Sequence, residues 1–465
     1  MPSFALNNSV RTPLLVLGVI EALVLFSSVY FAGAVQYGNV PAAVVTLGPL
    51  WPRALIVTIV LLASLIAMGL YQFHQRLWYR EASVRLIVAI AAGGIALAVI
   101  YYALPGLALS REINAIAVSY ALVLLLIVRL YFVRNVDTNV FRRKILVYGA
   151  GERAARIAEL RRRADRRGFK VVGQVVARGD TDVAGIDALR LNGKTLVELA
   201  EERGAEEIVV AMDDRRGNLP IRQLLDCRLR GIEVCDLIEF LERETGKIWI
   251  ELVRPGWLIF SPGFRVSKLR HFNKRLVDFL ASSVLMLVAL PVMLIVAIAI
   301  KFEDGPRSPI LYRQKRVGRN NRVFYVLKFR SMRVDAEASG QAVWASKDDD
   351  RITRVGAVLR KLRLDELPQI LNVFRGQMSL VGPRPERPEF VQSLRESIPY
   401  YAERHTVNPG VTGWAQLRYS YGANEEDALE KLQYDLYYVK NQSLLLDLMI
   451  ILQTVEVVLW GKGAR

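Results

Sequence analysis

The chain has 465 residues, of which 52% are hydrophobic, and its formal net charge at pH 7 is +17. This length exceeds one ordinary domain, and the high apolar fraction predicts membrane segments within a multidomain protein. The basic balance suits anionic lipid, nucleic acid or phosphorylated substrates as partners. With only 3 histidines and 2 cysteines, a zinc site is not expected, and Cys227 and Cys235 are expected to be reduced structural thiols.

Four apolar runs open the chain, and each is near the length that an α-helix needs to cross a bilayer. Buried helices of a soluble core are the alternative, but such runs rarely occur four in succession. The runs therefore predict a four-helix transmembrane bundle within residues 1–135, without a cleavable signal peptide. They are Thr12–Val35, Ala54–Phe73, Leu86–Leu104 and Ile113–Phe132.

Basic residues gather at alternate ends of these runs and predict the orientation of the bundle. By the positive-inside rule, the N-terminus and everything after the fourth run lie on the cytoplasmic side. Only Arg53 and Arg111 stand at the opposite ends. The cations on the cytoplasmic side are Arg11, Arg76, Arg80, Arg85, Arg134, Arg142, Arg143 and Lys144.

Residues 143–251 have the pattern of a Rossmann-like α/β domain. Lys144–Tyr148 predicts a buried strand, Gly149-Ala150-Gly151 a tight turn, and Ala154–Arg163 a helix. The pattern continues with strands at Lys170–Val176 and Glu207–Met212 and helices at Gly193–Arg203 and Ile221–Gly231.

The turn at Gly149-Ala150-Gly151 has the strand–turn–helix context of a dinucleotide site, but two further signals are missing. Ala177-Arg178-Gly179-Asp180 offers no acidic residue directly at the end of the second strand to hold a ribose. Four residues after Tyr148 stands Glu152, so the Tyr-x-x-x-Lys pair of short-chain dehydrogenases is lacking. A retained nucleotide or regulatory role and a purely structural module both remain open.

A linker over residues 252–270 leads to a fifth apolar run at Phe279–Ile300. Its length alone predicts a span, but a full crossing would put the residues after it on the side away from the α/β domain. Lys274-Arg275 and Lys301 place cations at both ends, and Pro291 interrupts the run. These features predict a re-entrant helix, about residues 275–301, that enters the inner leaflet, bends and returns.

Residues 271–465, which include this helix, are expected to form an α+β domain. Tyr312–Lys328 alternates basic and apolar residues and predicts short strands and turns at the membrane surface, with a solvated basic face as the alternative. Asp348-Asp349-Asp350 looks like a metal cluster, but consecutive acids cannot all face one ion, so a loop leading into a helix at Ile352–Leu362 is expected. Ser443–Trp460 predicts a helix packed on the domain rather than another span.

An acidic pair, Asp365-Glu366, stands behind the basic residues Arg360-Lys361-Leu362-Arg363 and ahead of the apolar run Ile370–Phe374. Its simplest structural explanation is a helix start, with Asp365 as the N-cap and Glu366 in the first turn. Carboxylates among arginines also suit phosphate chemistry, because one carboxylate can attack phosphorus or hold a metal while guanidinium groups bind phosphoryl oxygens. The two interpretations are compatible.

Several short motifs surround this pair. They are Tyr312-Arg313-Gln314 with Arg316-Val317-Gly318, Lys328-Phe329-Arg330-Ser331-Met332, Leu364-Asp365-Glu366-Leu367-Pro368-Gln369, Val381-Gly382-Pro383-Arg384-Pro385 and Pro409-Gly410-Val411-Thr412-Gly413-Trp414-Ala415-Gln416. From about His271 to its end, the chain therefore resembles the bacterial sugar transferases, the large membrane-bound polyprenyl-phosphate phosphoglycosyl transferases of exopolysaccharide biosynthesis. Five matches in the family's order are far more specific than a lone Asp-Glu.

The resemblance implies an enzyme of the bacterial inner membrane that moves sugar-1-phosphate from a UDP-sugar to undecaprenyl phosphate and releases UMP. Asp365 would attack the β-phosphorus to give a covalent phosphosugar–aspartate intermediate, which the lipid phosphate then attacks. Glu366 would bind Mg²⁺. This reaction would initiate the assembly of an exopolysaccharide or another glycoconjugate.

The resemblance also assigns supporting residues and partners. It implies that the re-entrant helix turns at Pro291, and that the bilayer but no nucleic acid is a partner. A homodimer and downstream glycosyltransferases are further candidate partners. The implied phosphate-binding residues are Lys328, Arg330, Arg360 and Arg384, and the implied substrate-positioning residues are Pro383, Pro385, Glu386 and Gln416.

Two positions depart from the family's pattern and bear on sugar preference: Arg363, where a small hydroxyl residue is common, and Asn408, where lysine is frequent. Two other functions compete with this interpretation. A membrane-tethered enzyme that modifies nucleotide-sugars would have its chemistry in the α/β domain, and a non-enzymatic membrane scaffold would use the basic surface only to bind. The missing Tyr-x-x-x-Lys pair argues against the first, and the ordered motifs argue against the second.

Overall fold

The structure is a computed structural model that describes residues 8–68, 70–71, 79–135, 142–160, 168–180, 188–216, 218–253, 255–261, 263–264, 267–333, 351–419 and 424–460. Contacts along the chain separate two units, Met1–Leu252 with Val455–Gly461 and Val253–Thr454 with Lys462–Arg465. The first unit contains a group of apolar helices and a parallel sheet. The second contains the acidic pair and all the motifs around it.

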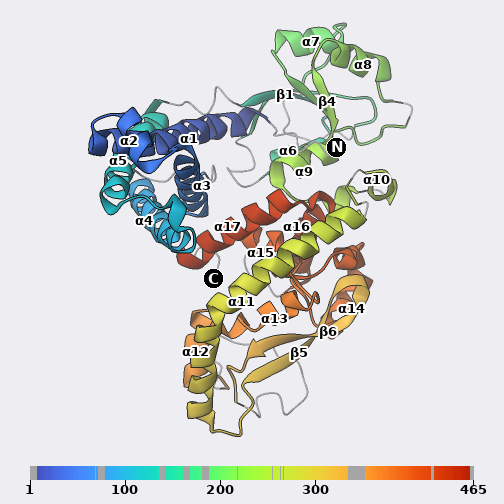
Figure 1. Cartoon of the computed structure of the whole chain (residues 1–465). Helices are drawn as coiled ribbons and strands as arrows, with labels where there is room; N and C mark the ends of the chain where they lie inside the picture. The colour runs from blue at the N-terminus through green and yellow to red at the C-terminus, as the bar shows by residue number, and fades with distance from the viewer. Residues whose placement is uncertain are drawn as a thin grey trace. The chain divides into compact units, whose positions relative to one another are not determined.

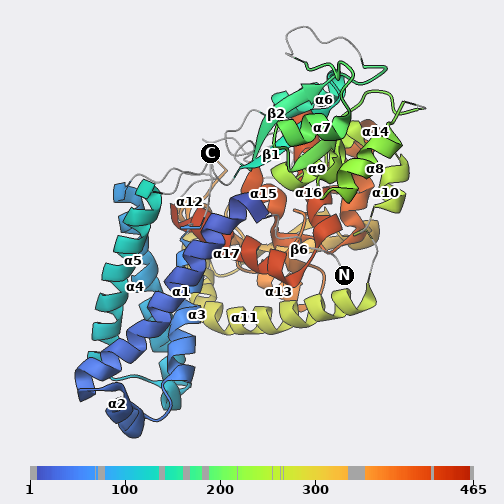
Figure 2. The same ribbon diagram turned by 90° about the horizontal axis from the view of Figure 1, so that it is seen from above.

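The apolar helices of the first unit lie side by side (Figure 2). Three of them, α1, α4 and α5, are long and apolar enough to cross a membrane, with mean hydropathy of 2.2 to 2.3. The second predicted run differs, because α3 ends early and reaches span length only together with α2, to which it is bent by 94°. The helices are α1 (Asn8–Tyr37), α2 (Val40–Leu47), α3 (Trp51–Ala67), α4 (Tyr79–Ala103) and α5 (Arg111–Asn135), with the 3₁₀ turn η1 (Pro105–Leu107) before α5.

Buried arginines hold the backbone where α3 ends. The Arg85 guanidinium donates to the carbonyl of Met68 at 3.1 Å, and that of Arg129 donates to the carbonyl of Leu70 at 3.0 Å. Arg129 also forms an ion pair with Glu21 of α1 at 2.7 Å. Because carbonyls and charges in an apolar bundle need partners, these contacts explain how α3 can stop at Ala67.

The α/β domain contains a four-stranded parallel sheet, of which Figure 1 labels β1 and β4. The order of its strands is β2-β1-β3-β4. Alternate residues of its strands face opposite layers. Leu146 of β1 packs in the layer that includes α7 and α8, whereas Val147 packs in the layer that includes α6 and α9. The elements are β1 (Arg143–Tyr148), α6 (Glu152–Ala158), β2 (Phe169–Val175), α7 (Leu196–Glu202), β3 (Glu207–Val210), α8 (Ile221–Leu229), β4 (Glu233–Asp236), α9 (Leu237–Thr245) and η2 (Ile250–Leu252).

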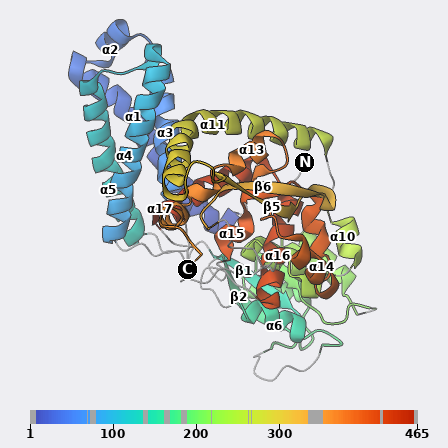
Figure 3. The same ribbon diagram turned by 90° about the horizontal axis from the view of Figure 1, so that it is seen from below.

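The second unit begins with α10 (Pro255–Phe260) and the long helix α11 (Lys268–Asp304). Figures 1 and 3 show α11 as two arms that meet at a bend. Pro291 lies inside this helix, and proline removes a backbone hydrogen bond and clashes with the preceding turn, which bends helices. Only 11% of its apolar stretch is buried within the protein. A bent, apolar, exposed helix agrees with the prediction, while its re-entrant path through a bilayer stays a prediction.

The rest of the second unit packs short strands and helices against α11. An antiparallel hairpin joins β5 to β6, as the alternating pattern predicted, and a short parallel pair joins β7 to β8. The triple-aspartate segment lies outside the described residues. The elements are β5 (Leu311–Val317), η3 (Arg319–Asn321), β6 (Val323–Phe329), α12 (Arg354–Lys361), η4 (Leu364–Glu366), α13 (Gln369–Phe374), β7 (Ser379–Val381), α14 (Pro388–Ser397), η5 (Tyr401–Thr406), β8 (Gly410–Thr412), α15 (Trp414–Arg418), α16 (Glu425–Asn441) and α17 (Leu444–Trp460).

A buried ion pair connects the first arm of α11 to the last helix. Lys274 contacts Asp447 of α17 at 2.7 Å, and the Tyr438 hydroxyl donates to the same carboxylate at 2.7 Å. The apolar stretch of α17 is shorter than a membrane span. Asp447, which interrupts the terminal apolar run, is therefore an internal contact of the domain.

Candidate active site

The acidic pair lies in a tight turn between two helices and does not begin either of them. Arg363 has φ +55°, a left-handed backbone conformation that reverses the chain after α12 and before η4. The residue at the N-cap of α13 is Pro368, and neither η4 nor α13 has a side-chain capping hydrogen bond. The explanation of Asp365 as a helix cap is therefore wrong. A left-handed arginine costs about 1 kcal/mol or more, which marks this turn as a strained feature beside charged groups.

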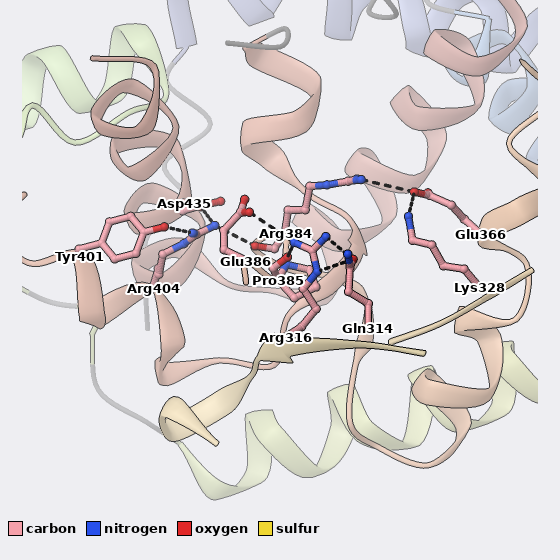
Figure 4. Close-up of polar contacts among 10 residues, drawn as sticks. All are labelled: Gln314, Arg316, Lys328, Glu366, Arg384, Pro385, Glu386, Tyr401, Arg404 and Asp435. Atoms are coloured by element: carbon pink, nitrogen blue, oxygen red, sulfur yellow. Dashed lines mark hydrogen bonds and ion pairs between the residues drawn. The ribbon is translucent and has the colours of Figure 1, made fainter. Parts of the chain in front are cut away.

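Glu366 joins two cations from distant parts of the chain (Figure 4). Its Oε1 atom accepts hydrogen bonds from Lys328 of β6 at 3.0 Å and from Arg384 at 3.4 Å. Burial disfavours the ionised carboxylate, but Lys328 and Arg384 outweigh burial and lower the pKa of Glu366 to about 2. Glu366 is therefore a permanent negative charge at neutral pH.

Asp365 is a half-buried neighbour with the opposite tendency. Burial raises the pKa of its carboxyl group, and the Glu366 carboxylate acts in the same direction. Lys328 and Arg360 oppose this rise because they stabilise the ionised form. Two adjacent carboxylates thus have pKa values displaced in opposite directions, which is typical of residues with different chemical roles.

The backbone around Arg384 is held at four consecutive carbonyl groups, each by a donor from another part of the chain. Two flanking prolines fix φ and leave Arg384 few conformations. Two of the donors are side chains, those of Arg316 and Arg404 (Figure 4). The contacts are Gly410 N to Pro383 O at 2.9 Å, Arg404 Nη2 to Arg384 O at 3.0 Å, Arg316 Nη1 to Pro385 O at 3.0 Å and Val317 N to Glu386 O at 2.9 Å.

The β7–β8 pair joins two sequence motifs, the one at Val381–Pro385 and the one that begins at Pro409. Ser379 pairs with Gly410, and Val381 pairs with Thr412. Gly382 packs so closely on the second strand that a Cβ atom there would lie 2.3 Å from the Asn408 carbonyl oxygen. The glycine is thus required by close approach of two backbones, and the motif that ends in Arg384 is fixed by the motif that begins at Pro409.

Asn372, inside the apolar run after the acidic pair, fixes α13 to β6 and was not predicted as a site residue. Its side chain is fully buried, accepts from the Leu327 amide at 3.0 Å and donates to the Tyr325 carbonyl at 2.7 Å. It also donates to Gln377 at 2.8 Å. These bonds hold the acidic turn beside Lys328, the next residue of β6.

Arg330 and Arg360 do not join the Lys328–Glu366–Arg384 contact. Arg330 is buried and forms an ion pair with Asp304, the last residue of α11, at 2.6 Å. Its Nε and Nη1 atoms and the Nη1 atom of Arg360 are buried without a hydrogen-bond partner among the described residues. Native proteins rarely leave such donors unpaired, which makes these atoms candidate donors to an anion.

The remaining residues of the motifs have their described contacts with residues other than the acidic pair. Glu386 forms an ion pair with Arg316 at 3.5 Å. Gln416 lies in α15, and its buried amide nitrogen has no partner among the residues that the structure describes. Trp414 is buried and stacks on Tyr437 with 5.9 Å between ring centroids, as expected for a packing residue rather than a chemical one.

A magnesium ion would have few protein ligands here. The described residues contain no group of three or more His, Cys, Asp or Glu side chains arranged to hold a metal. Both cations that bind Glu366 contact Oε1, which leaves Oε2 as the oxygen for a metal. Because Mg²⁺ commonly binds through one or two carboxylates together with substrate phosphates and water, the pair Asp365-Glu366 fits an ion that arrives with a diphosphate.

The glycine turn of the α/β domain is filled by the chain's own carboxylates. Asp180 accepts from the Ala150 amide at 2.7 Å, and Asp213 accepts from the Glu152 and Arg153 amides at 3.1 and 2.9 Å. These amides at the helix start are the groups that would bind a dinucleotide phosphate. A phosphate would have to displace both aspartates, which favours the structural alternative for this domain.

Comparison with known proteins agrees with the site in the second unit. The family model of the bacterial sugar transferases matches residues 269–461. The exopolysaccharide production protein PSS of Rhizobium leguminosarum bv. phaseoli is 44% identical over 197 residues, which cover 41% of this chain and 97% of that protein. The chain belongs to the bacterial sugar transferase family.

Other members of the bacterial sugar transferase family match more of this chain. The UDP-N-acetylgalactosamine-undecaprenyl-phosphate N-acetylgalactosaminephosphotransferase of Aeromonas hydrophila is 42% identical over 52% of this chain and 56% of its own length. The undecaprenyl-phosphate glucose phosphotransferase of Komagataeibacter xylinus is 34% identical over 70% of this chain and 61% of its own length. The chain thus spans somewhat more than half of these two relatives.

Replacing Asn372 tests whether α13 depends on its buried amide. We expect Asn372→Leu to lower the midpoint of thermal unfolding, because each buried partner left unpaired costs about 1–3 kcal/mol. The measurement is thermal unfolding of the full chain in detergent. Asn408→Ala is the matched control, since among the described residues the Asn408 side chain makes one hydrogen bond, to the Gly376 carbonyl at 3.2 Å. Equal midpoints for the two variants would contradict the role given to Asn372.

Proposed function

We propose that the chain transfers sugar-1-phosphate from a UDP-sugar to undecaprenyl phosphate, giving undecaprenyl-diphosphate-sugar and UMP. The single observation that carries the proposal is the contact of Glu366 with Lys328 and Arg384 beside Asp365. Family membership supports it, because the relatives' names describe transfer of glucose or N-acetylgalactosamine phosphate to undecaprenyl phosphate. The reaction would initiate the assembly of an exopolysaccharide or another glycoconjugate.

In the first step, a carboxylate oxygen of Asp365 attacks the β-phosphorus of the UDP-sugar. The bond from that phosphorus to the bridging oxygen breaks, and UMP leaves with the electron pair. The sugar phosphate is then bound to Asp365 as an acyl phosphate. No histidine base is needed, because an ionised carboxylate has no proton to lose.

In the second step, an oxygen of the undecaprenyl phosphate attacks the same phosphorus. The bond to Asp365 breaks, and the carboxylate is restored as it was before the first step. The acceptor is itself an anion, so the site must bring two anions together. Phosphoryl transfer depends mainly on such positioning and charge neutralisation.

Cations of this chain supply that neutralisation. Lys328 and Arg384 both contact Glu366. Their positive charges would therefore act together on the diphosphate. The donors of Arg330 and Arg360 that have no partner among the described residues would bind further phosphoryl oxygens. Glu366 would hold Mg²⁺, which when bound neutralises the diphosphate and the departing UMP.

The membrane arrangement forms part of the proposal. The cationic ends of the apolar helices favour a cytoplasmic position for the domains after them, in a bacterial inner membrane. Nucleotide-sugars occur in the cytoplasm, and α11 would bring the site to the inner leaflet by bending back. The relatives differ in the sugar that their names give, so the sugar is a matter for a panel of UDP-sugars.

The nucleophile is tested by an exchange reaction without lipid. With a UDP-sugar, Mg²⁺ and labelled UMP, the unchanged protein should return label to the UDP-sugar, because the first step is reversible and needs no acceptor. Asp365→Asn should abolish this exchange. Retained exchange by that variant, at a thermal midpoint equal to the parent's, would refute Asp365 as the nucleophile.

The pH dependence of the exchange should follow the ionisation of Asp365. The rate falls as pH drops through the pKa of this group, which lies above its ordinary value of 3.8. Glu366, with a pKa of about 2, stays ionised over the same range. Arg360→Gln removes a cation that stabilises the Asp365 carboxylate, so its acid limb should move to higher pH. A shift to lower pH would contradict this assignment, and thermal unfolding at each pH controls for acid denaturation.

The phosphate-binding role of Arg384 is tested by steady-state kinetics of UMP release. Arg384→Ala should lower kcat and raise KM together, reducing kcat/KM about 100- to 1,000-fold, because the guanidinium acts in both the ground state and the transition state. Arg395→Ala, an exposed arginine on α14, is the matched control and should match the unchanged protein. A variant at position 384 with unchanged kcat and KM would remove Arg384 from the site.

A further inference from the structure

Behind the candidate active site lies a buried charged cluster around Arg404 (Figure 4). Arg404 forms an ion pair with Asp435 of α16 at 2.7 Å and donates to the Tyr401 hydroxyl at 2.7 Å. All three residues are at most 5% exposed. A buried ion pair gives little net stability compared with apolar residues of the same volume. Its presence in this place therefore calls for another explanation.

The cluster ends on the backbone of Arg384. The same Nη2 atom that contacts Asp435 donates to the Arg384 carbonyl at 3.0 Å. Of the four donors that hold residues 383–386, two are backbone amides, and two are the guanidinium groups of Arg316 and Arg404. Arg404 is the donor that reaches residue 384 itself.

The direction of the Arg384 side chain follows from its own backbone. That side chain reaches Glu366 at 3.4 Å, a long contact that a small rotation of the peptide would break. Asp435 and Tyr401 determine where the Arg404 guanidinium lies, because each binds a different nitrogen of its planar fork. A rigid fork held at two points can fix the position of a third group.

We propose that Arg404 and Asp435 are positioning residues, which hold the backbone of Arg384 so that its guanidinium meets the phosphate and Glu366. They touch neither substrate nor reacting atoms. The inference rests on the proposed function, since it assigns a purpose to Arg384 in that reaction. It also explains why a charged pair occupies a site where leucine or methionine would pack as well.

The test removes the pair without leaving a lone buried charge. In Arg404→Met/Asp435→Leu both charges are lost together, a change that proteins tolerate better than the loss of one partner. We expect the full chain to keep its fold, checked by thermal unfolding in detergent, while kcat/KM for UMP release falls about 10- to 100-fold. Arg404→Lys is the conservative second variant, and it should lose activity because one ammonium group cannot replace the fork.

The decisive readout is a double-mutant cycle with Arg384→Ala. If the pair acts only by positioning Arg384, its replacement should cause no further loss once the Arg384 side chain is gone. Lys274→Met/Asp447→Leu is the matched control, since it removes another buried ion pair of the same unit, with a contact of 2.7 Å, that touches none of residues 383–386. This control should leave kcat/KM near the parent value.

Each outcome decides a different question. Losses that multiply in the Arg384→Ala background, or full activity in Arg404→Met/Asp435→Leu, would overturn the positioning role and leave the proposed function intact. An Arg384→Ala variant with normal kinetics would overturn both the role of Arg384 in the reaction and the inference built on it. A loss that disappears in the Arg384→Ala background supports the proposal.

Discussion

The candidate site depends on one constraint: two cations contact the largely buried Glu366 carboxylate and outweigh the effect of burial on its pKa. Lys328 comes from β6, and Arg384 comes from a segment fixed between two prolines. Removing a carboxylate from water is unfavourable unless opposite charges compensate. The fold must therefore bring both segments to the acidic turn. The surrounding contacts hold the two segments there.

Those contacts act mainly on the backbone. Asn372 ties α13 to β6 through the carbonyl and amide groups of Tyr325 and Leu327. The β7–β8 pair fixes the segment that leads into Arg384, and Gly382 permits the close approach of the two strands. Since side-chain positions at a reactive site matter within fractions of an ångström, fixing the chain beneath a charged group is as important as the group itself.

Local patterns in the sequence predicted much of this architecture. The apolar runs, the strand and glycine turn at the start of the α/β domain, the β5–β6 hairpin and the last helix all follow from periodicity. Several elements were not predicted, among them β4 and α9 of the α/β domain, because Glu233–Asp236 is a short strand with few apolar residues and α9 follows it without a loop. The early end of α3 could not be foreseen either, since it depends on arginines from other helices.

At the site, sequence motifs predicted the acidic pair and its cations but not the residues that position them. Asn372 stands in an apolar run, and Arg404 and Asp435 belong to no recognised motif. Their importance arises from tertiary contacts between distant segments, which no local pattern records. Arg330 illustrates the converse, because its motif suggested a phosphate ligand while the structure pairs it with Asp304. Two of its donors remain unpaired among the described residues, so the pairing and an anion contact are compatible.

Proteins bind phosphate through backbone amides at a helix start or through cationic side chains, and this chain contains both arrangements. Among the described residues, the amides are already paired with carboxylates, whereas some of the side-chain donors are not. Backbone amides at a helix start form an anion site in the α/β domain, but Asp180 and Asp213 already occupy it. In the second unit the donors are side chains, and Nε and Nη1 of Arg330 and Nη1 of Arg360 have no partner within the described part of the chain. A site built of arginine and lysine side chains suits a reaction that joins two phosphorylated anions, because such cations neutralise charge as well as donate hydrogen bonds. An amide turn filled with carboxylates repels the same anions. The distribution of charge within the chain therefore favours phosphate binding in the second unit and a structural role for the α/β domain.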